Sequence, residues 1–134
     1  MQQPHTIYIV DDDDAVRDSL RALLESCDFK VQDFASATEF LARRNGPRGD
    51  CLLLDLHMPQ VDGLSLLEKM RANGSQMPTI VITGRSDPLL KQRAQESGAF
   101  ALFDKPVAET ALLNAIALAI ASDARHAVSA AARP

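Results

Sequence analysis

Five short apolar runs, rich in β-branched residues, alternate along this chain with stretches of helical periodicity. Strands are expected at 6–10, 29–34, 51–54, 78–83 and 101–103. Between these runs apolar residues recur every three or four positions, as Val16, Leu20 and Leu24 do, and this spacing is typical of amphipathic helices. The last helix is expected at 108–121. Five successive strand–helix units predict a parallel sheet with helices on both faces and right-handed crossovers.

Local signals mark several helix ends. Ser36-Ala37-Thr38-Glu39 has the spacing of a capping box, in which the first and fourth residues satisfy free backbone donors. Ser86 and Pro88 suit the cap and first turn of a later helix. Asn73-Gly74 should end the helix that Gly63 opens, because glycine readily adopts the left-handed conformation found after helices.

The composition indicates one globular domain. Of the 134 residues, 46% are hydrophobic and 24% are charged, which is typical of folded domains. The formal net charge of -4 argues against direct nucleic-acid binding, which needs a cationic face. The apolar stretch 111–121 is interrupted by Asn114 and is too short to cross a bilayer. The first four residues lack the Lys or Arg of a signal peptide. We therefore expect no membrane association.

The two cysteines, Cys27 and Cys51, lack the spacing of a metal site or a redox pair. Both are expected to be buried free thiols, which favours a reducing compartment. The sequence thus predicts a cytoplasmic protein.

Acidic and polar side chains follow four of the apolar runs. Asp11 and Asp12 follow the first run, Asp55 follows the third, Thr83 ends the fourth and Lys105 comes shortly after the fifth. The carboxyl ends of parallel strands share one edge of the sheet, and ligands bind there where the strand order reverses. For a strand order of 2-1-3-4-5, the reversal lies between the strands that carry the aspartates.

These residue types suit phosphoryl transfer. Neighbouring carboxylates repel one another unless a cation lies among them, and oxygen ligands without His or Cys suit Mg²⁺. A carboxylate beside such a metal can attack a phosphoryl group, while an ammonium and a hydroxyl neutralise its oxygens. Asp55 is the expected nucleophile, with Lys105 and Thr83 in the supporting roles. The predicted reaction is formation and hydrolysis of an aspartyl phosphate.

The order and spacing of these motifs resemble the receiver domain of two-component response regulators, in particular its FixJ/NarL-like branch. Asp55 lies 44 residues after Asp11, Thr83 lies 28 residues after Asp55, and Lys105 follows 22 residues later. The resemblance implies a flavodoxin-like (βα)5 three-layer sandwich with sheet order 2-1-3-4-5. It covers residues 6 to about 121, so we predict a receiver domain at 1–121.

By this resemblance, Asp55 is the phosphoacceptor. Asp11, Asp12, Asp55 and the backbone carbonyl of His57 would hold Mg²⁺, whereas Asp13 and Asp14 are expected to cap and charge the following helix instead.

The resemblance also assigns the phosphoryl-binding groups and the partners. Thr83 and Lys105 would bind the phosphoryl group, and the peptide bond before Pro106 would be cis. The phosphoryl donor would be a sensor histidine kinase or a phosphotransfer protein. A homodimer is a further expectation from the family. The protein would be a phosphoacceptor with at most slow self-dephosphorylation, rather than an enzyme.

The chain departs from the family at the switch position three residues before Lys105, where receivers usually carry Tyr or Phe. Leu102 stands there, and Phe103 lies on the opposite strand face, because side chains alternate along a strand. We expect Thr83 still to move on phosphorylation while Leu102 repacks.

Two other functions and the end of the chain stay open. A receiver can act as a binding module without phosphate, which Leu102 slightly favours. A Mg²⁺-dependent phosphatase typically has a second Asp two residues after its nucleophile, where this chain has His57. The Ala-rich residues 122–134 fit a helix extension or a truncated linker, so the chain is a stand-alone receiver or part of a longer regulator.

Overall fold

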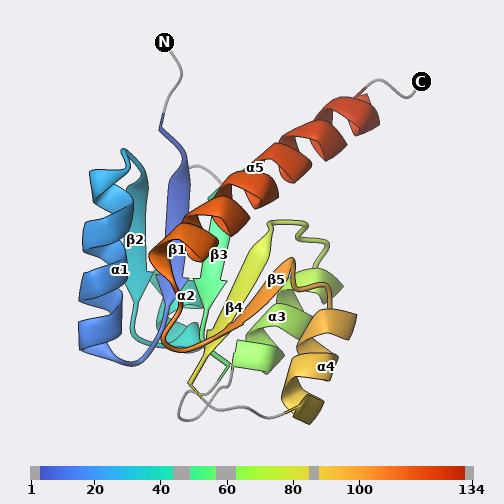
Figure 1. Cartoon of the computed structure of the whole chain (residues 1–134). Helices are drawn as coiled ribbons and strands as arrows, with labels where there is room; N and C mark the ends of the chain where they lie inside the picture. The colour runs from blue at the N-terminus through green and yellow to red at the C-terminus, as the bar shows by residue number, and fades with distance from the viewer. Residues whose placement is uncertain (1–3, 44–48, 57–62, 85–87, 132–134) are drawn as a thin grey trace.

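Strand and helix alternate throughout the chain, in the order that the sequence predicts (Figure 1). The computed structural model describes residues 4–43, 49–56, 63–84 and 88–131. The strands are β1 (Thr6–Val10), β2 (Lys30–Phe34), β3 (Cys51–Leu54), β4 (Thr79–Thr83) and β5 (Ala101–Asp104). The helices are α1 (Asp14–Ser26), α2 (Ala37–Arg43), α3 (Gly63–Ala72), α4 (Pro88–Glu96) and α5 (Glu109–Ala131).

The strands form one parallel sheet in the order β2-β1-β3-β4-β5, which confirms the predicted order. The order reverses between β1 and β3, where Val10 is the register partner of Leu54. The next residues along these strands are Asp11 and Asp55, so the two aspartates leave adjacent strands at the same edge.

Two hydrophobic clusters fill the layers on either side of the sheet. Tyr8 and Val10 of β1 point into the cluster that packs against α2, α3 and α4. Ile7 and Ile9 point into the cluster beneath α1 and α5. Figure 1 shows these two groups of helices on opposite faces. The β3 run Cys51–Leu54 is buried throughout, because this central strand is covered on both faces.

The predicted capping residues lie at the expected helix ends. Asp13 accepts hydrogen bonds from Ala15 N at 2.9 Å and from Val16 N at 3.3 Å, so it is the N-cap of α1. Ser36 Oγ accepts from Glu39 N at 3.0 Å, and the Glu39 carboxylate accepts from Ala35 N at 3.3 Å. The return bond thus goes to Ala35 rather than to Ser36 as in a regular capping box.

The other predicted boundaries fall close to those observed. Gly74, two residues beyond α3, has φ +85°, and Gly98, beyond α4, has φ +94°; this left-handed conformation costs glycine little. Pro88 is the first residue of α4, and its predicted cap, Ser86, lies outside the described residues.

The burial expected for Cys27 is wrong, whereas the last helix is extended, which is one of the two alternatives for the Ala-rich tail. Cys27 is exposed, not buried, because it lies one residue past α1, beyond the apolar face that packs on the sheet. Cys51 is buried, and both thiols are free. Helix α5 continues past residue 121 to Ala131, and its last turns extend beyond the sheet (Figure 1). No helix among the described residues is long and apolar enough to cross a membrane.

Phe40 of α2 offers a test of the core. Its side chain is fully buried, and its ring packs edge-on against Tyr8 and Phe34 at centroid distances of 5.4 and 5.2 Å. We expect Phe40→Ala to lower the free energy of unfolding by about 3–5 kcal/mol, measured by urea denaturation.

The matched control is Leu118→Ala on α5, where the side chain is 60% exposed. It should change the free energy of unfolding by less than about 0.5 kcal/mol. Equal losses in the two variants would contradict the assignment of Phe40 to the core.

Candidate functional site

Two buried carboxylates meet at the carboxyl edge of the sheet. Asp11 and Asp55, which follow β1 and β3, are 3% and 5% exposed. Their backbones continue the ladder, since Asp11 N donates to Phe34 O at 3.1 Å and Asp55 N donates to Val10 O at 3.0 Å. The sheet register therefore holds two like charges at the point where the strand order reverses, as predicted.

Lys105 bridges these carboxylates. Its Nζ donates to Asp11 Oδ2 at 2.8 Å and to Asp55 Oδ2 at 3.3 Å. Its backbone N–H donates to Thr83 O at 2.8 Å, which ties the start of the β5–α5 connection to the end of β4. Burial lowers the pKa of Lys105, but the hydrogen bond to Asp11 and the charges of Asp11 and Asp55 outweigh burial and raise this pKa above its usual value.

Asp12 completes an acidic cluster that is suited to a metal ion. Carboxylate oxygens of Asp11, Asp12 and Asp55 all lie within 4.8 Å of one another, and Asp12 is exposed, so the cluster opens to solvent. Taken together, these three carboxylates and the single ammonium of Lys105 carry a formal net charge of -2. A divalent cation with a preference for oxygen ligands, such as Mg²⁺, fits this charge and donor set.

The backbone N–H of Asp13 orients the buried carboxylate of Asp11. Asp13 N donates to Asp11 Oδ1 at 2.9 Å, while the Asp13 side chain caps α1. Asp14 lies in the first turn of the same helix. Asp13 therefore acts as the cap that the sequence predicts.

Arg17 contributes to the site although sequence reasoning did not identify it. Its Nη1 donates to Asp11 O at 2.7 Å, and its Nε donates to Asp33 Oδ2 at 3.1 Å. Burial lowers the pKa of Arg17, but hydrogen bonds to Asp14 and Asp33 outweigh burial and raise it. This arginine joins the Asp11 main chain to the end of β2. The sequence signal for this role was the position of Arg17, a basic residue about one turn into the helix that follows the acidic run.

Gly63 is the second contributor whose role the sequence left unstated. Gly63 N donates to Leu56 O at 3.1 Å, so the start of α3 lies against the end of β3. A Cβ atom at position 63 would lie 2.1 Å from Asp55 O. No side chain fits there without displacing the backbone of the proposed nucleophile.

Thr83 and the peptide bond before Pro106 lie where the motif places them. Thr83 is buried at the last position of β4, and its register partner on β5 is Asp104. The Lys105–Pro106 peptide bond is cis, the isomer that the resemblance implies. His57 lies outside the described residues, so its carbonyl as a metal ligand stays a prediction.

Leu102 and Phe103 point to opposite sides of the sheet, as the strand alternation requires. Leu102 packs against the cluster beneath α2, α3 and α4, whereas Phe103 packs against the one beneath α1 and α5. Phe103 therefore does not replace the aromatic residue that receivers usually have at the Leu102 position.

The match to known proteins agrees with this geometry. Residues 7–117 match the family model of the response regulator receiver domain. The chain belongs to this family. This receiver is 41% identical over 118 residues to the response regulator protein TmoT of Ectopseudomonas mendocina, covering 88% of the chain and 54% of TmoT. It is 40% identical over 114 residues to the transcriptional regulatory protein FixJ of Bradyrhizobium diazoefficiens, covering 85% of the chain and 56% of FixJ.

Solved structures give the same result for the fold. A CheY-like receiver domain from Methanospirillum hungatei JF-1 has a TM-score of 0.86 at 31% identity, over 92% of this chain and 98% of that one. Full-length FixJ from B. japonicum has a TM-score of 0.86 at 37% identity, over 97% of this chain and 64% of that one. The receiver spans about half the length of the curated relatives that it matches. The predicted family, its FixJ-like branch and the fold are confirmed.

Gly63 gives a test of how the site is built. We expect Gly63→Ala to lower the midpoint of thermal unfolding and to slow phosphorylation by a small phosphodonor at least tenfold. The added Cβ displaces the Asp55–Leu56 backbone, and small misplacements of reacting groups cost large factors in rate.

Gly84→Ala is the matched control, because a Cβ at position 84 would meet Lys105 Cδ at an ordinary contact distance of 3.6 Å. Circular dichroism would follow unfolding and intact-protein mass spectrometry would follow phosphorylation. Normal rates in Gly63→Ala would contradict the tight approach of α3 to Asp55.

Proposed function

We propose that this receiver accepts a phosphoryl group on Asp55 from a histidine kinase or a phosphotransfer protein, and that phosphorylation changes which partner it binds. The observation that carries this proposal is the pair of hydrogen bonds from Lys105 Nζ to Asp11 and Asp55. An ammonium already in contact with the nucleophile is placed to meet the negative charge of an incoming phosphoryl group. We place the receiver in the cytoplasm, where response regulators work.

In the forward step, an Asp55 oxygen attacks the phosphorus of a phosphohistidine. The new phosphorus–oxygen bond forms as the phosphorus–nitrogen bond breaks, and the imidazole leaves with that electron pair. Lys105 turns its N–H donors from the carboxylates to a phosphoryl oxygen, and the Thr83 hydroxyl donates to another. Asp11, Asp12, Asp55 and the His57 carbonyl would hold Mg²⁺, which would supply positive charge to this crowded group of anions.

Dephosphorylation by water would involve the same residues. A water oxygen bonds to the phosphorus as the phosphorus–oxygen bond to Asp55 breaks, so that Asp55 is left as a carboxylate and inorganic phosphate leaves with the protons of the water. Lys105 then returns to its bonds with Asp11 and Asp55. We propose that the protein is a phosphoacceptor with at most slow self-dephosphorylation, rather than an enzyme that turns over other substrates.

The response is proposed to spread through β4 and β5. The phosphoryl group draws the Thr83 hydroxyl inward, and Leu102 on the neighbouring strand repacks towards the space this leaves. Leu102 and Leu90 of α4 pack against the same core cluster, and Lys91 pairs with Asp104 of β5. Movement in β5 therefore reaches the α4–β5–α5 face, which we propose as the surface for a homodimer.

Phosphorylation of Asp55 is tested with acetyl phosphate and Mg²⁺, read by intact-protein mass and gel filtration. We expect a Mg²⁺-dependent adduct of one phosphoryl group on the wild type and none on Asp55→Asn, because the amide is not a nucleophile. Asp18→Asn, an exposed change on α1, should react normally. A phosphorylation-dependent increase in size would support the homodimer. No adduct on folded protein would point instead to a binding module that works without phosphate.

Metal binding is tested by thermal unfolding with added MgCl₂. A ligand that binds only the folded state at tenfold excess over its Kd stabilises it by about 1.4 kcal/mol. We expect this gain in the wild type and its loss in Asp12→Asn, which removes an exposed ligand. Asp18→Asn should keep the gain, and NaCl at matched ionic strength should not reproduce it. Equal stabilisation of Asp12→Asn would contradict the proposed ligand set.

A further inference from the structure

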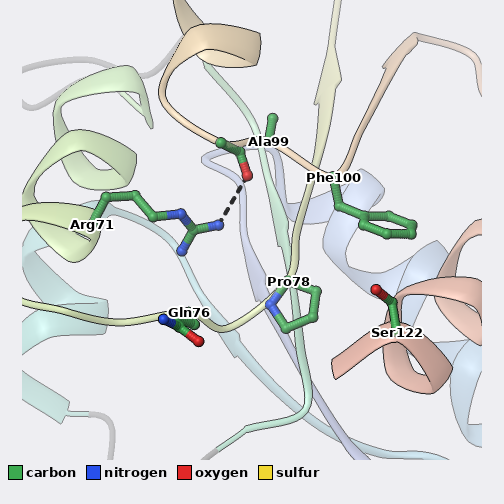
Figure 2. A pocket seen from close by; sticks show the side chains of 7 residues that line it. Arg71, Gln76, Pro78, Ala99, Phe100 and Ser122 are labelled. Atoms are coloured by element: carbon green, nitrogen blue, oxygen red, sulfur yellow. Dashed lines mark hydrogen bonds between the residues drawn. The ribbon is translucent and has the colours of Figure 1, made fainter. Parts of the chain in front are cut away.

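A pocket lies at the opposite end of the sheet from Asp55, and Figure 2 shows the side chains that line it. Several of the residues that line it lie just before the amino ends of strands β4 and β5, not at their carboxyl ends. Pro78 immediately precedes β4, and Ala99 and Phe100 immediately precede β5. Arg71 in the last turn of α3 and Ser122 of α5 line it from either side. The pocket therefore shares no residue with the acidic site.

Arg71 is held across one wall by neutral acceptors. Its Nη1 donates to Ser75 O at 3.2 Å and its Nη2 donates to Gly98 O at 3.1 Å. A Cβ atom at position 98 would lie 3.1 Å from Arg71 Nε, so the guanidinium lies closely over Gly98. Burial lowers the pKa of Arg71. Two of its five N–H donors are used in these bonds, and the other three have no acceptor among the residues that the structure describes.

Arg71 differs in its partners from the other arginines whose side chains the structure describes. Those four, Arg17, Arg21, Arg43 and Arg93, each pair with a carboxylate. Among the described residues, no ion pair involves Arg71. A partly buried charge without a counterion is costly. An anion that entered the pocket would offset this cost.

The remaining walls indicate what kind of anion fits. Gln76 brings an amide and Ser122 a hydroxyl, both of which can donate hydrogen bonds. Pro78 and Phe100 supply apolar surface, and the Phe100 side chain is 40% exposed. Figure 2 shows Arg71 on one side of the pocket, with Pro78, Phe100 and Ser122 on the other. Charge and apolar surface thus lie within one small hollow.

We propose that this pocket binds a small organic carboxylate with an apolar body. The carboxylate would lie on Arg71, whose planar fork matches its two oxygens, with Gln76 and Ser122 as neutral donors. The apolar body would lie against Phe100 and Pro78. A single cation suits a monoanion better than a doubly charged phosphate. The proposal does not depend on phosphorylation of Asp55.

The test is a titration of the ¹⁵N-labelled chain with benzoate, without Mg²⁺ or phosphodonor. We expect saturable shifts of the Gly98, Ala99 and Phe100 amide signals. Benzamide, which lacks the charge, and acetate, which lacks the ring, should each bind at least tenfold more weakly. Arg71→Gln should lose the response, and Arg93→Gln, which removes an exposed arginine paired with Glu68, should keep it.

Arg71→Gln also removes two bonds to the main chain, so a second variant leaves Arg71 intact. Ser122→Glu adds a carboxylate at the pocket wall that competes for Arg71 and repels benzoate. It should weaken benzoate binding at least tenfold, whereas Ser122→Gln should change it little. Equal binding of benzoate and benzamide, or unchanged benzoate binding in Ser122→Glu, would overturn the proposal. Acetate that binds as tightly as benzoate would refute the role of the apolar wall.

Discussion

The hydrogen bonds from Lys105 to Asp11 and Asp55 are the interaction on which the candidate site depends. The sheet register places two buried carboxylates next to each other, an arrangement that would be strongly unfavourable without a cation. Lys105 offsets part of that repulsion, and the cis peptide bond follows directly after it. The negative charge that remains suits a divalent ion, so the same carboxylates that repel one another form a cluster that could hold a metal ion.

The residues around this centre hold its backbone in place. Arg17 fixes the main chain of Asp11 from α1, and the Asp13 N–H fixes its carboxylate. Gly63 lets α3 approach Asp55 more closely than any side chain would allow. Each of these contacts restricts where a carboxylate oxygen can lie, and phosphoryl transfer depends on that position.

The basic side chains at the two ends of the sheet, Lys105 and Arg71, have different kinds of partner. At the carboxyl end, Lys105 lies between acids that raise its pKa. At the amino end, the partners of Arg71 among the described residues are backbone carbonyls, and burial lowers its pKa. Strands β4 and β5 run from one site to the other, so a carboxylate bound at Arg71 would touch the entry of the same strands whose exits carry Thr83 and Lys105.

The sequence alone determined the order of strands and helices, the caps, and the chemistry at the strand ends. The helices, strands and caps depend on periodicity and turn residues within a few positions, as the Asp13 cap does. That Asp11 and Asp55 lie close together was predicted from the order of the motifs along the chain. Tertiary structure alone decided the rest. The closeness of Gly63 to Asp55, the bond from Arg17 to the Asp11 main chain and the bond from Arg71 to Gly98 O depend on how separate elements pack. Cys27 is exposed for the same reason, since helical spacing does not reveal where a helix leaves the core. Local patterns fix which face of an element is apolar, but only packing fixes the distance to its neighbour.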